Sequence, residues 1–175
     1  KGRTKKKYVV LAPTGVAALN VDGQTVHSFF RFPPKLLNAE DIIMQWKKAS
    51  LFSHLELVII DEVSMVSADL MNAVDCALRK NRDRPNDPFG GVQMMFIGDL
   101  FQLSPVIKDD FTKKHFDKLY GGEYFFDAPV FKRGYKYIFR ELTYIFRQKN
   151  EEFKELLNKI RVGLTDFNVM AALNS

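Results

Sequence analysis

The sequence predicts an α/β fold in which helices cover both faces of a parallel β-sheet. Two observations predict it: short apolar runs typical of buried strands, and segments with helical periodicity that lie between or after them. Strands that alternate with helices pair in parallel, because each crossover returns the chain to the same end of the sheet. The four candidate strands are Tyr8–Ala12, Leu55–Ile60, Met94–Ile97 and Tyr137–Phe139.

Three segments have the apolar spacing of helices. Asn38 is expected to cap the first, which carries Ile42, Ile43 and Trp46. Ser67 is expected to cap the second, which carries Leu70, Val74 and Leu78 on one face. The third runs from about Glu151 to Arg161, with Phe153, Leu156, Leu157 and Ile160 in phase. Residues 81–91 are dense in charge, Pro and Gly and predict a loop, whereas residues 108–134 show no clean period.

Composition points to one ordinary globular domain. A chain of 175 residues is long enough for a core, and 46% of it is hydrophobic. No apolar run reaches the length of a membrane span and no signal peptide opens the sequence. Cys76 is the only cysteine, so a disulfide framework is excluded, and the three histidines lie too far apart in sequence to predict a zinc site. We therefore expect an intracellular protein without a membrane partner, cytoplasmic in a bacterium and nuclear or mitochondrial in a eukaryote.

The net charge of +5 does not establish nucleic-acid binding. Five of the 26 basic residues lie in the first seven positions, which leaves 21 basic residues to balance 21 acidic ones. A basic terminus can contact phosphates, but such a run is more often a solvated end of the chain.

Two acids, Asp61 and Glu62, directly follow the run Leu55–Ile60. A parallel sheet places its chemistry at the carboxyl ends of its strands. An Asp at that position can hold Mg²⁺, usually through water, and a neighbouring Glu can polarise an attacking water. The alternative for an isolated pair is a strand that ends in ordinary surface acids.

The other strand ends carry groups that suit phosphate chemistry. After the first strand, Thr14 and Gly15 form a turn whose backbone N–H groups can approach a phosphate, although a tight packing turn fits equally well. After the third, Gln102 can bind a phosphate oxygen or position a water. After the fourth, Arg147 can fork onto transferring phosphate oxygens, or be a surface residue. Together these groups match the layout of a nucleoside-triphosphate hydrolase.

One element of such an enzyme is missing. A Gly-rich loop with Lys-Ser/Thr is needed to cradle the β- and γ-phosphates. The chain has ten glycines, and none is followed by lysine. We therefore expect this chain by itself to bind ATP poorly and to be inactive.

The order of the motifs resembles the PIF-type (petite integration frequency) DNA helicases, superfamily-one motors that move 5′ to 3′ on single-stranded DNA and are related to RecD-type helicases. The resemblance rests on segments 12–18, 25–30, 61–66, 98–106 and 146–148. It implies a RecA-like fold of the P-loop NTPase type. Residues 1–175 would then be part of the first motor domain, without its Walker A strand and without the second motor domain.

The resemblance also implies roles for individual residues. Asp61 would be the Mg²⁺ ligand and Glu62 the catalytic base, while Gln102 and Arg147 would contact the γ-phosphate of ATP. The DNA strand would meet Thr14, Gly15, His27, Ser28 and Phe29, since an aromatic ring next to small polar groups suits base stacking and phosphate contact. The alternative for Phe29 and Phe30 is core packing, which we expect for one of the two. The implied partners are single-stranded and forked duplex DNA, the implied parent is a monomer, and the implied processes are DNA repair, recombination and telomere maintenance. Asp22-Gly23 departs from the paired glycines that the family often has.

Two other functions remain open at this point. One is a single-stranded nucleic-acid-binding module with a degenerate ATPase fold. The other is a metal-dependent phosphohydrolase that uses Asp61, Glu62 and Asp99.

The missing Walker A strand has a structural consequence. In this family it lies between the third and last strands, so its loss leaves unpaired apolar edges. We expect Tyr137–Phe139 to close the gap, or the fragment to self-associate through these edges.

Overall fold

The computed structural model describes residues 5–146, 148 and 150–164. It divides into two compact units, Lys1–Lys136 and Tyr137–Ser175, each of which is described by itself.

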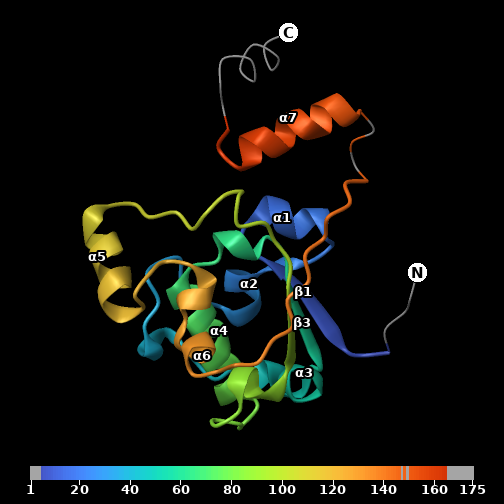
Figure 1. The fold of residues 1–175 in the computed structure, drawn as a ribbon. Helices are drawn as coiled ribbons and strands as arrows, with labels where there is room; N and C mark the ends of the chain where they lie inside the picture. Colours follow the sequence, from blue (N-terminus) through green and yellow to red (C-terminus); the bar gives the residue numbers. More distant parts are fainter. Residues whose placement is uncertain (1–4, 147, 149, 165–175) are drawn as a thin grey trace. The chain divides into compact units, whose positions relative to one another are not determined.

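The first unit is built on a four-stranded parallel sheet, as predicted (Figure 1). The strand order is β2-β1-β3-β4. The strands are β1 (Tyr8–Ala12), β2 (Gln24–Thr25), β3 (Leu57–Ile60) and β4 (Gln93–Phe96). Three of the four expected strands are therefore confirmed within one or two residues, and the two-residue strand β2 has no counterpart among the sequence-based predictions.

Six α-helices follow or connect these strands: α1 (Gly15–Asn20), α2 (Val26–Phe30), α3 (Ala49–His54), α4 (Ala68–Asn81), α5 (Asp110–Leu119) and α6 (Pro129–Lys132). The longest, α4, is the predicted helix with Leu70, Val74 and Leu78 buried. Ser67 stands at its N-cap position, but its hydroxyl donates to Asp69 instead of accepting from the backbone. Every helix in the described residues is too short or too polar to span a membrane.

One face of the sheet forms the main hydrophobic core. The register pairs Val58 with Val9 and Met94, so side chains of three strands alternate onto the same face. Val58 is fully buried and joins a cluster that includes residues of α2, α3 and α4. Other elements cover the opposite face of the sheet less completely, as the side chain of Met95 on that face shows by its 48% exposure.

The predicted helix after Asn38 is wrong. The segment forms two 3₁₀ turns, Ala39–Asp41 and Trp46–Lys48, with irregular backbone between them. Ile42 is buried, whereas Ile43 and Trp46 are 53% and 78% exposed, so the three side chains share no face. The backbone N–H of Gln45 donates to the side chain of Asn81 at 2.7 Å. A tertiary hydrogen bond thus satisfies a backbone N–H that would otherwise donate to a carbonyl within the helix.

The predicted strand Tyr137–Phe139 is also wrong, and with it the idea that this segment closes the sheet. These residues have no regular structure and are 64% to 81% exposed. In the described part of the chain, β4 is an edge strand. Tyr135 covers part of β4, because its hydroxyl hydrogen-bonds to the Met94 backbone. Burial of this hydroxyl raises the pKa of Tyr135. Self-association through this edge stays a prediction.

Residues 108–134, which show no clean period, contain α5, a 3₁₀ turn at Phe125–Asp127 and α6. The side chain of Asp109 caps α5 by accepting a hydrogen bond from the Thr112 backbone at 2.7 Å. This bond lowers the pKa of the Asp109 carboxyl. Only Phe116 of α5 is buried, so the helix has too narrow an apolar stripe for its period to be visible in the sequence.

The second unit contains the predicted C-terminal helix, α7 (Glu151–Arg161). Asn150 caps it by accepting a hydrogen bond from the Phe153 backbone at 3.0 Å. Acidic side chains in the first turn and basic ones in the last turn complement the helix dipole.

Candidate functional site

The sheet register brings three predicted strand ends to one level. Leu11 pairs with Ile60, and Ile60 pairs with Phe96. The Asp61 N–H then donates to the Leu11 carbonyl at 2.8 Å, and the Ile97 N–H donates to the Ile60 carbonyl at 2.9 Å. Backbone hydrogen bonds therefore continue past the strands and fix the first residues of the functional edge.

Asp61 and Glu62 lie at the centre of this edge, and both are half-buried. Glu62 has a positive φ of 50°, which is uncommon for a residue other than glycine. A hydrogen bond of 2.9 Å from the Val63 N–H to the Ile97 carbonyl holds the chain directly after it. The chain therefore turns sharply directly after Asp61, at the end of β3.

The donor set at Asp61 fits Mg²⁺. Within the described residues the Asp61 carboxylate makes no hydrogen bond or ion pair, so both oxygens can face a hydrated cation. In the described residues, no three or more His, Cys, Asp or Glu side chains are grouped so that they could hold a metal ion. Mg²⁺ needs no such cage, because it commonly keeps several waters and takes one or two carboxylates together with substrate phosphates.

The loop after β4 carries Gln102 and is held by Asp99. The Asp99 carboxylate accepts hydrogen bonds from the Phe101 N–H at 3.0 Å and from Gln102 Nε2 at 3.2 Å. The Gln102 N–H also donates to the Asp99 carbonyl at 3.0 Å. The side-chain bond uses one N–H of the Gln102 amide, which leaves the second N–H as a donor and the carbonyl oxygen as an acceptor.

Gly98 allows this loop to approach the acidic loop. A Cβ at position 98 would lie 3.0 Å from Val63 N and 3.1 Å from Val63 Cγ1. The backbone of the Gln102 loop therefore packs directly on the turn that follows Glu62. This close approach explains why position 98 is a glycine.

The two predicted DNA-contact segments begin at capped helices. Thr14 Oγ1 accepts from the Ala17 N–H at 3.2 Å at the start of α1, and Thr25 Oγ1 accepts from the Ser28 N–H at 3.1 Å at the start of α2. Strand pairing aligns Thr25 with Ala12, so both helix starts lie at the functional edge. Gly15 and Ser28 are exposed there.

His27 is half-buried in α2, and burial lowers its pKa, opposed by the charge of Asp69. The lowered pKa favours a neutral imidazole at neutral pH, so His27 contributes a hydrogen-bonding group and not a permanent cation.

Phe29 does not present its ring to a DNA base. It is 2% exposed and Phe30 is 1% exposed. The two rings meet edge to face at 4.9 Å, and Phe29 also contacts Phe52 at 5.6 Å. The expectation of base stacking on Phe29 is wrong because both rings are used in the core.

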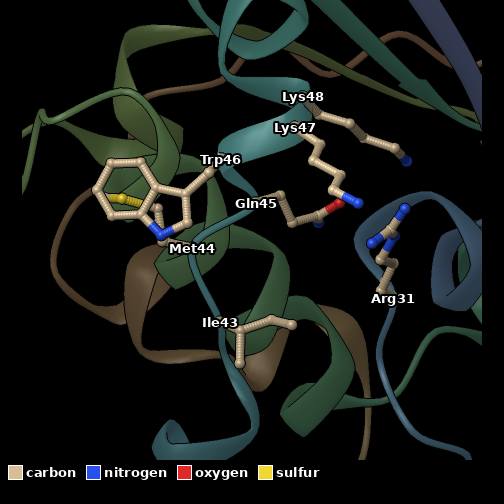
Figure 2. A pocket seen from close by; sticks show the side chains of 7 residues that line it. All are labelled: Arg31, Ile43, Met44, Gln45, Trp46, Lys47 and Lys48. Atoms are coloured by element: carbon tan, nitrogen blue, oxygen red, sulfur yellow. The ribbon is translucent and has the colours of Figure 1, made fainter.

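Arg147, the predicted arginine of the site, lies outside the described residues. The structure thus places these segments after the carboxyl ends of neighbouring strands, with Thr14 and Gly15 after β1, Asp61 and Glu62 after β3, and Gln102 in the loop after β4. Arg147 stays a prediction. The sequence did not predict a separate pocket around Gln45 and Trp46 (Figure 2). Its only signal in the sequence is a tryptophan followed by two lysines, at positions 46–48.

A parallel sheet with acids and a glutamine beyond the carboxyl ends of its strands is the arrangement of a RecA-like domain. The chain belongs to the PIF1-like helicase family, whose model matches residues 2–170.

Individual relatives agree with this membership. The ATP-dependent DNA helicase PIF1 of Saccharomyces cerevisiae is 32% identical over 93% of this chain, and Pif1 of Campylobacter jejuni is 30% identical over 99% of it. The crystal structure of Bacteroides Pif1 bound to single-stranded DNA is 40% identical over 96% of this chain, with a TM-score of 0.88. The chain spans 18% and 38% of the two curated relatives and 39% of the Bacteroides chain.

Proposed function

We propose that this chain is part of the first motor domain of an ATP-dependent 5′-to-3′ DNA helicase. The observation that carries the proposal is the convergence of Asp61, Glu62 and Gln102 at one sheet edge in a member of the PIF1-like helicase family. We use "parent helicase" for the longer protein that also carries a phosphate-binding loop and a second motor domain.

The residues divide the chemistry of ATP hydrolysis among them. Asp61 would hold Mg²⁺, which neutralises charge on the β- and γ-phosphates when bound. Glu62 accepts the proton of the attacking water. Gln102, oriented by Asp99, donates its second Nε2–H to an oxygen of the γ-phosphate or accepts a hydrogen bond from the attacking water through Oε1. Arg147 compensates the charge that develops on the transferred phosphoryl group.

The starts of α1 and α2 form the proposed DNA contact, with Thr14, Gly15, His27 and Ser28 as its residues. Exposed small residues at helix starts let backbone N–H groups meet phosphates.

Support for DNA and nucleotide binding comes from the similar Bacteroides Pif1, which was solved with single-stranded DNA and with ADP-AlF3. A further similar structure is described as DNA unwinding at forked double-stranded DNA by two coordinating Pif1 helicases. We propose single-stranded and forked DNA as partners, a monomeric parent and an intracellular location.

The test is ATP hydrolysis by the parent helicase with and without single-stranded DNA. We expect hydrolysis that needs Mg²⁺ and rises with DNA, and no hydrolysis by the 175-residue chain. A parent helicase that hydrolyses ATP at the same rate without Mg²⁺ would overturn the proposal.

A non-catalytic binding module is the second candidate, favoured by the absence of a Gly-Lys pair. It predicts that the longer protein binds single-stranded DNA and does not hydrolyse ATP. The phosphohydrolase alternative is disfavoured, because the Asp99 carboxylate is engaged by Phe101 and Gln102 and is not presented as a metal ligand.

A further inference from the structure

Two adjoining cavities, of about 240 Å³ and 390 Å³, lie around the irregular segment that precedes α3. Met44, Gln45 and Trp46 line both of them, so the two cavities belong to one surface. We call it the Trp46 surface and define it by residues 43–48 together with Arg31 and Lys80.

The Trp46 surface lies toward the amino ends of the strands. α4 starts after the acids that follow β3, and the guanidinium of Arg82, directly after α4, donates to the Leu55 carbonyl at 2.8 Å, just before β3 begins. The end of α4 is therefore at the amino end of β3. Asn81, the last residue of α4, accepts from the Gln45 N–H at 2.7 Å and so holds the surface there. Figure 1 shows α1 and α3 at opposite ends of β1 and β3. A ligand on this surface binds away from the residues proposed for ATP chemistry.

One side of the surface is apolar and exposed. Trp46 is 78% exposed, and Ile43 is 53% exposed. Figure 2 shows the indole ring beside Met44, on one side of Gln45. Tryptophan is highly buried on average, and apolar groups that gather on a surface with a polar rim mark interaction sites. A flexible thioether next to the indole adapts to side chains of different shape.

The other side of the surface is positively charged. Arg31, Lys47 and Lys48 lie across Gln45 from the indole (Figure 2). No acid lines their cavity, and these cations form no salt bridge within the described residues. Lys48 Nζ donates to the Phe29 carbonyl at 2.8 Å, whereas Arg31 and Lys47 are exposed. Burial, and then the charge of Arg31, lower the pKa of Lys48, so a carboxylate placed here relieves a repulsion.

The indole and the cations face different sides of Gln45, so a ligand that meets both must be longer than one small molecule. An extended peptide advances about 3.3 Å per residue, so a few residues reach from one side to the other. We propose that the Trp46 surface binds a short acidic segment of a partner protein. An apolar side chain of the segment packs on Trp46 and Ile43, and its carboxylates pair with Arg31 and Lys47.

Charge and shape together favour a peptide over a nucleic-acid strand. A strand carries a phosphate at every nucleotide, so charge would also fall on the apolar side around Ile43 and Met44. A peptide can hold its carboxylates at one end and an apolar side chain at the other, which matches the two sides of the surface. Trp and Arg are also the residues that most often dominate the binding energy of protein interfaces. The inference goes beyond the proposed helicase function and does not depend on it.

The experiment uses dye-labelled decapeptides in which a run of glutamates is followed by one Phe, Leu or Val at varied spacing. Each is titrated with the 175-residue chain. Dye anisotropy reports binding, and the fluorescence of Trp46, the only tryptophan of the chain, reports contact at the surface. We expect saturable binding of at least one peptide, with the same Kd from both signals. Replacing its glutamates by glutamine, or its apolar residue by serine, should each weaken binding about tenfold or more.

Variants separate the surface from general charge. Trp46→Ala should weaken peptide binding about tenfold or more, as loss of a central aromatic contact does. Lys47→Glu should weaken it as well, with the larger effect at low salt. The matched controls are Phe111→Ala, whose ring is 76% exposed, and Lys114→Glu, both on α5, and both should bind as the unchanged chain does. Circular dichroism checks that each variant folds.

The remaining outcomes overturn the proposal in distinguishable ways. Failure of every peptide to bind, or binding that Trp46→Ala leaves unchanged, would remove the site and leave the test of ATP hydrolysis unaffected. Displacement of the peptide by a deoxythymidylate dodecamer that also quenches Trp46 would assign the surface to DNA. Binding by the 175-residue chain and not by the parent helicase would replace the partner protein with a segment of the parent itself. Self-association of the chain that Trp46→Ala abolishes would replace it with a second copy.

Discussion

The side-chain amide of Gln102 donates a hydrogen bond of 3.2 Å to the carboxylate of Asp99 three residues earlier. The same carboxylate accepts from the Phe101 N–H, so one acid determines both the shape of the loop and the orientation of the glutamine. Asp99 therefore acts as a positioning residue for the group that would contact the γ-phosphate.

Asp99→Ala should release Gln102 from this orientation. In the parent helicase we expect kcat for ATP hydrolysis to fall by about tenfold with a smaller change in the Kd for ATP, because positioning matters most in the transition state. Steady-state hydrolysis and equilibrium binding measure the two quantities. Asp117→Ala, an exposed acid on α5, is the control. An unchanged kcat in Asp99→Ala would show that Gln102 needs no tether.

Glu62→Gln should separate ATP binding from hydrolysis. The amide cannot accept a proton from water, so we expect hydrolysis by the parent helicase to fall by at least about a hundredfold while ATP still binds. Phosphate release and binding of a fluorescent ATP analogue check the two halves of this prediction. Retention of more than a tenth of the activity would remove Glu62 from the role of base.

Gly98→Ala should destabilise the fold. The added Cβ would meet Val63 N at 3.0 Å, and we expect the free energy of unfolding to fall by about 1–3 kcal/mol. Gly15→Ala is the matched control, because no atom lies within 4 Å of its added Cβ. Urea unfolding of the two variants compares them directly. Equal stabilities would mean that the two loops do not pack as described.

His27 predicts a pH dependence of stability. Burial lowers its pKa below the ordinary value of 6.5, so the unfolded chain binds a proton more readily than the folded one. The free energy of unfolding should therefore decrease as pH falls from 7 toward 5, and less so in His27→Gln. Denaturant unfolding across this range tests it. The same slope in both proteins would assign the dependence to other groups.

The edge of β4 predicts self-association of the 175-residue chain. Met95 and Ile97 near this edge are 48% and 41% exposed, and no strand in the described part of the chain pairs there. We expect a concentration-dependent increase in mass by analytical ultracentrifugation, reduced by Met95→Lys, because charged residues discourage edge pairing. A chain that stays monomeric at every concentration would contradict this.

The sequence predicted the elements with strong periodicity and clear ends. β1, β3 and α4 bury their apolar residues against one core, so local pattern and tertiary structure agree. The position of Asp61 and Glu62 at the carboxyl end of β3 was predictable for the same reason, because the strand itself was.

The errors arise where tertiary contacts decide. The segment after Asn38 has helical spacing, but the bond from Gln45 to Asn81 holds it in another conformation. Phe29 looked available for stacking, but its ring packs on Phe30 and Phe52. The pocket at Trp46 joins Arg31 to residues more than ten positions later, a juxtaposition that no local pattern encodes.

The most direct test of the central claim is binding of a fluorescent ATP analogue with Mg²⁺. The 175-residue chain is compared with a version extended at its front by one strand, loop and helix, on the order of 30 residues with a Gly-Lys loop. We predict binding by the extended version only, abolished by Lys→Ala in its new loop. Tight Mg²⁺-dependent binding by the 175-residue chain itself would contradict the account.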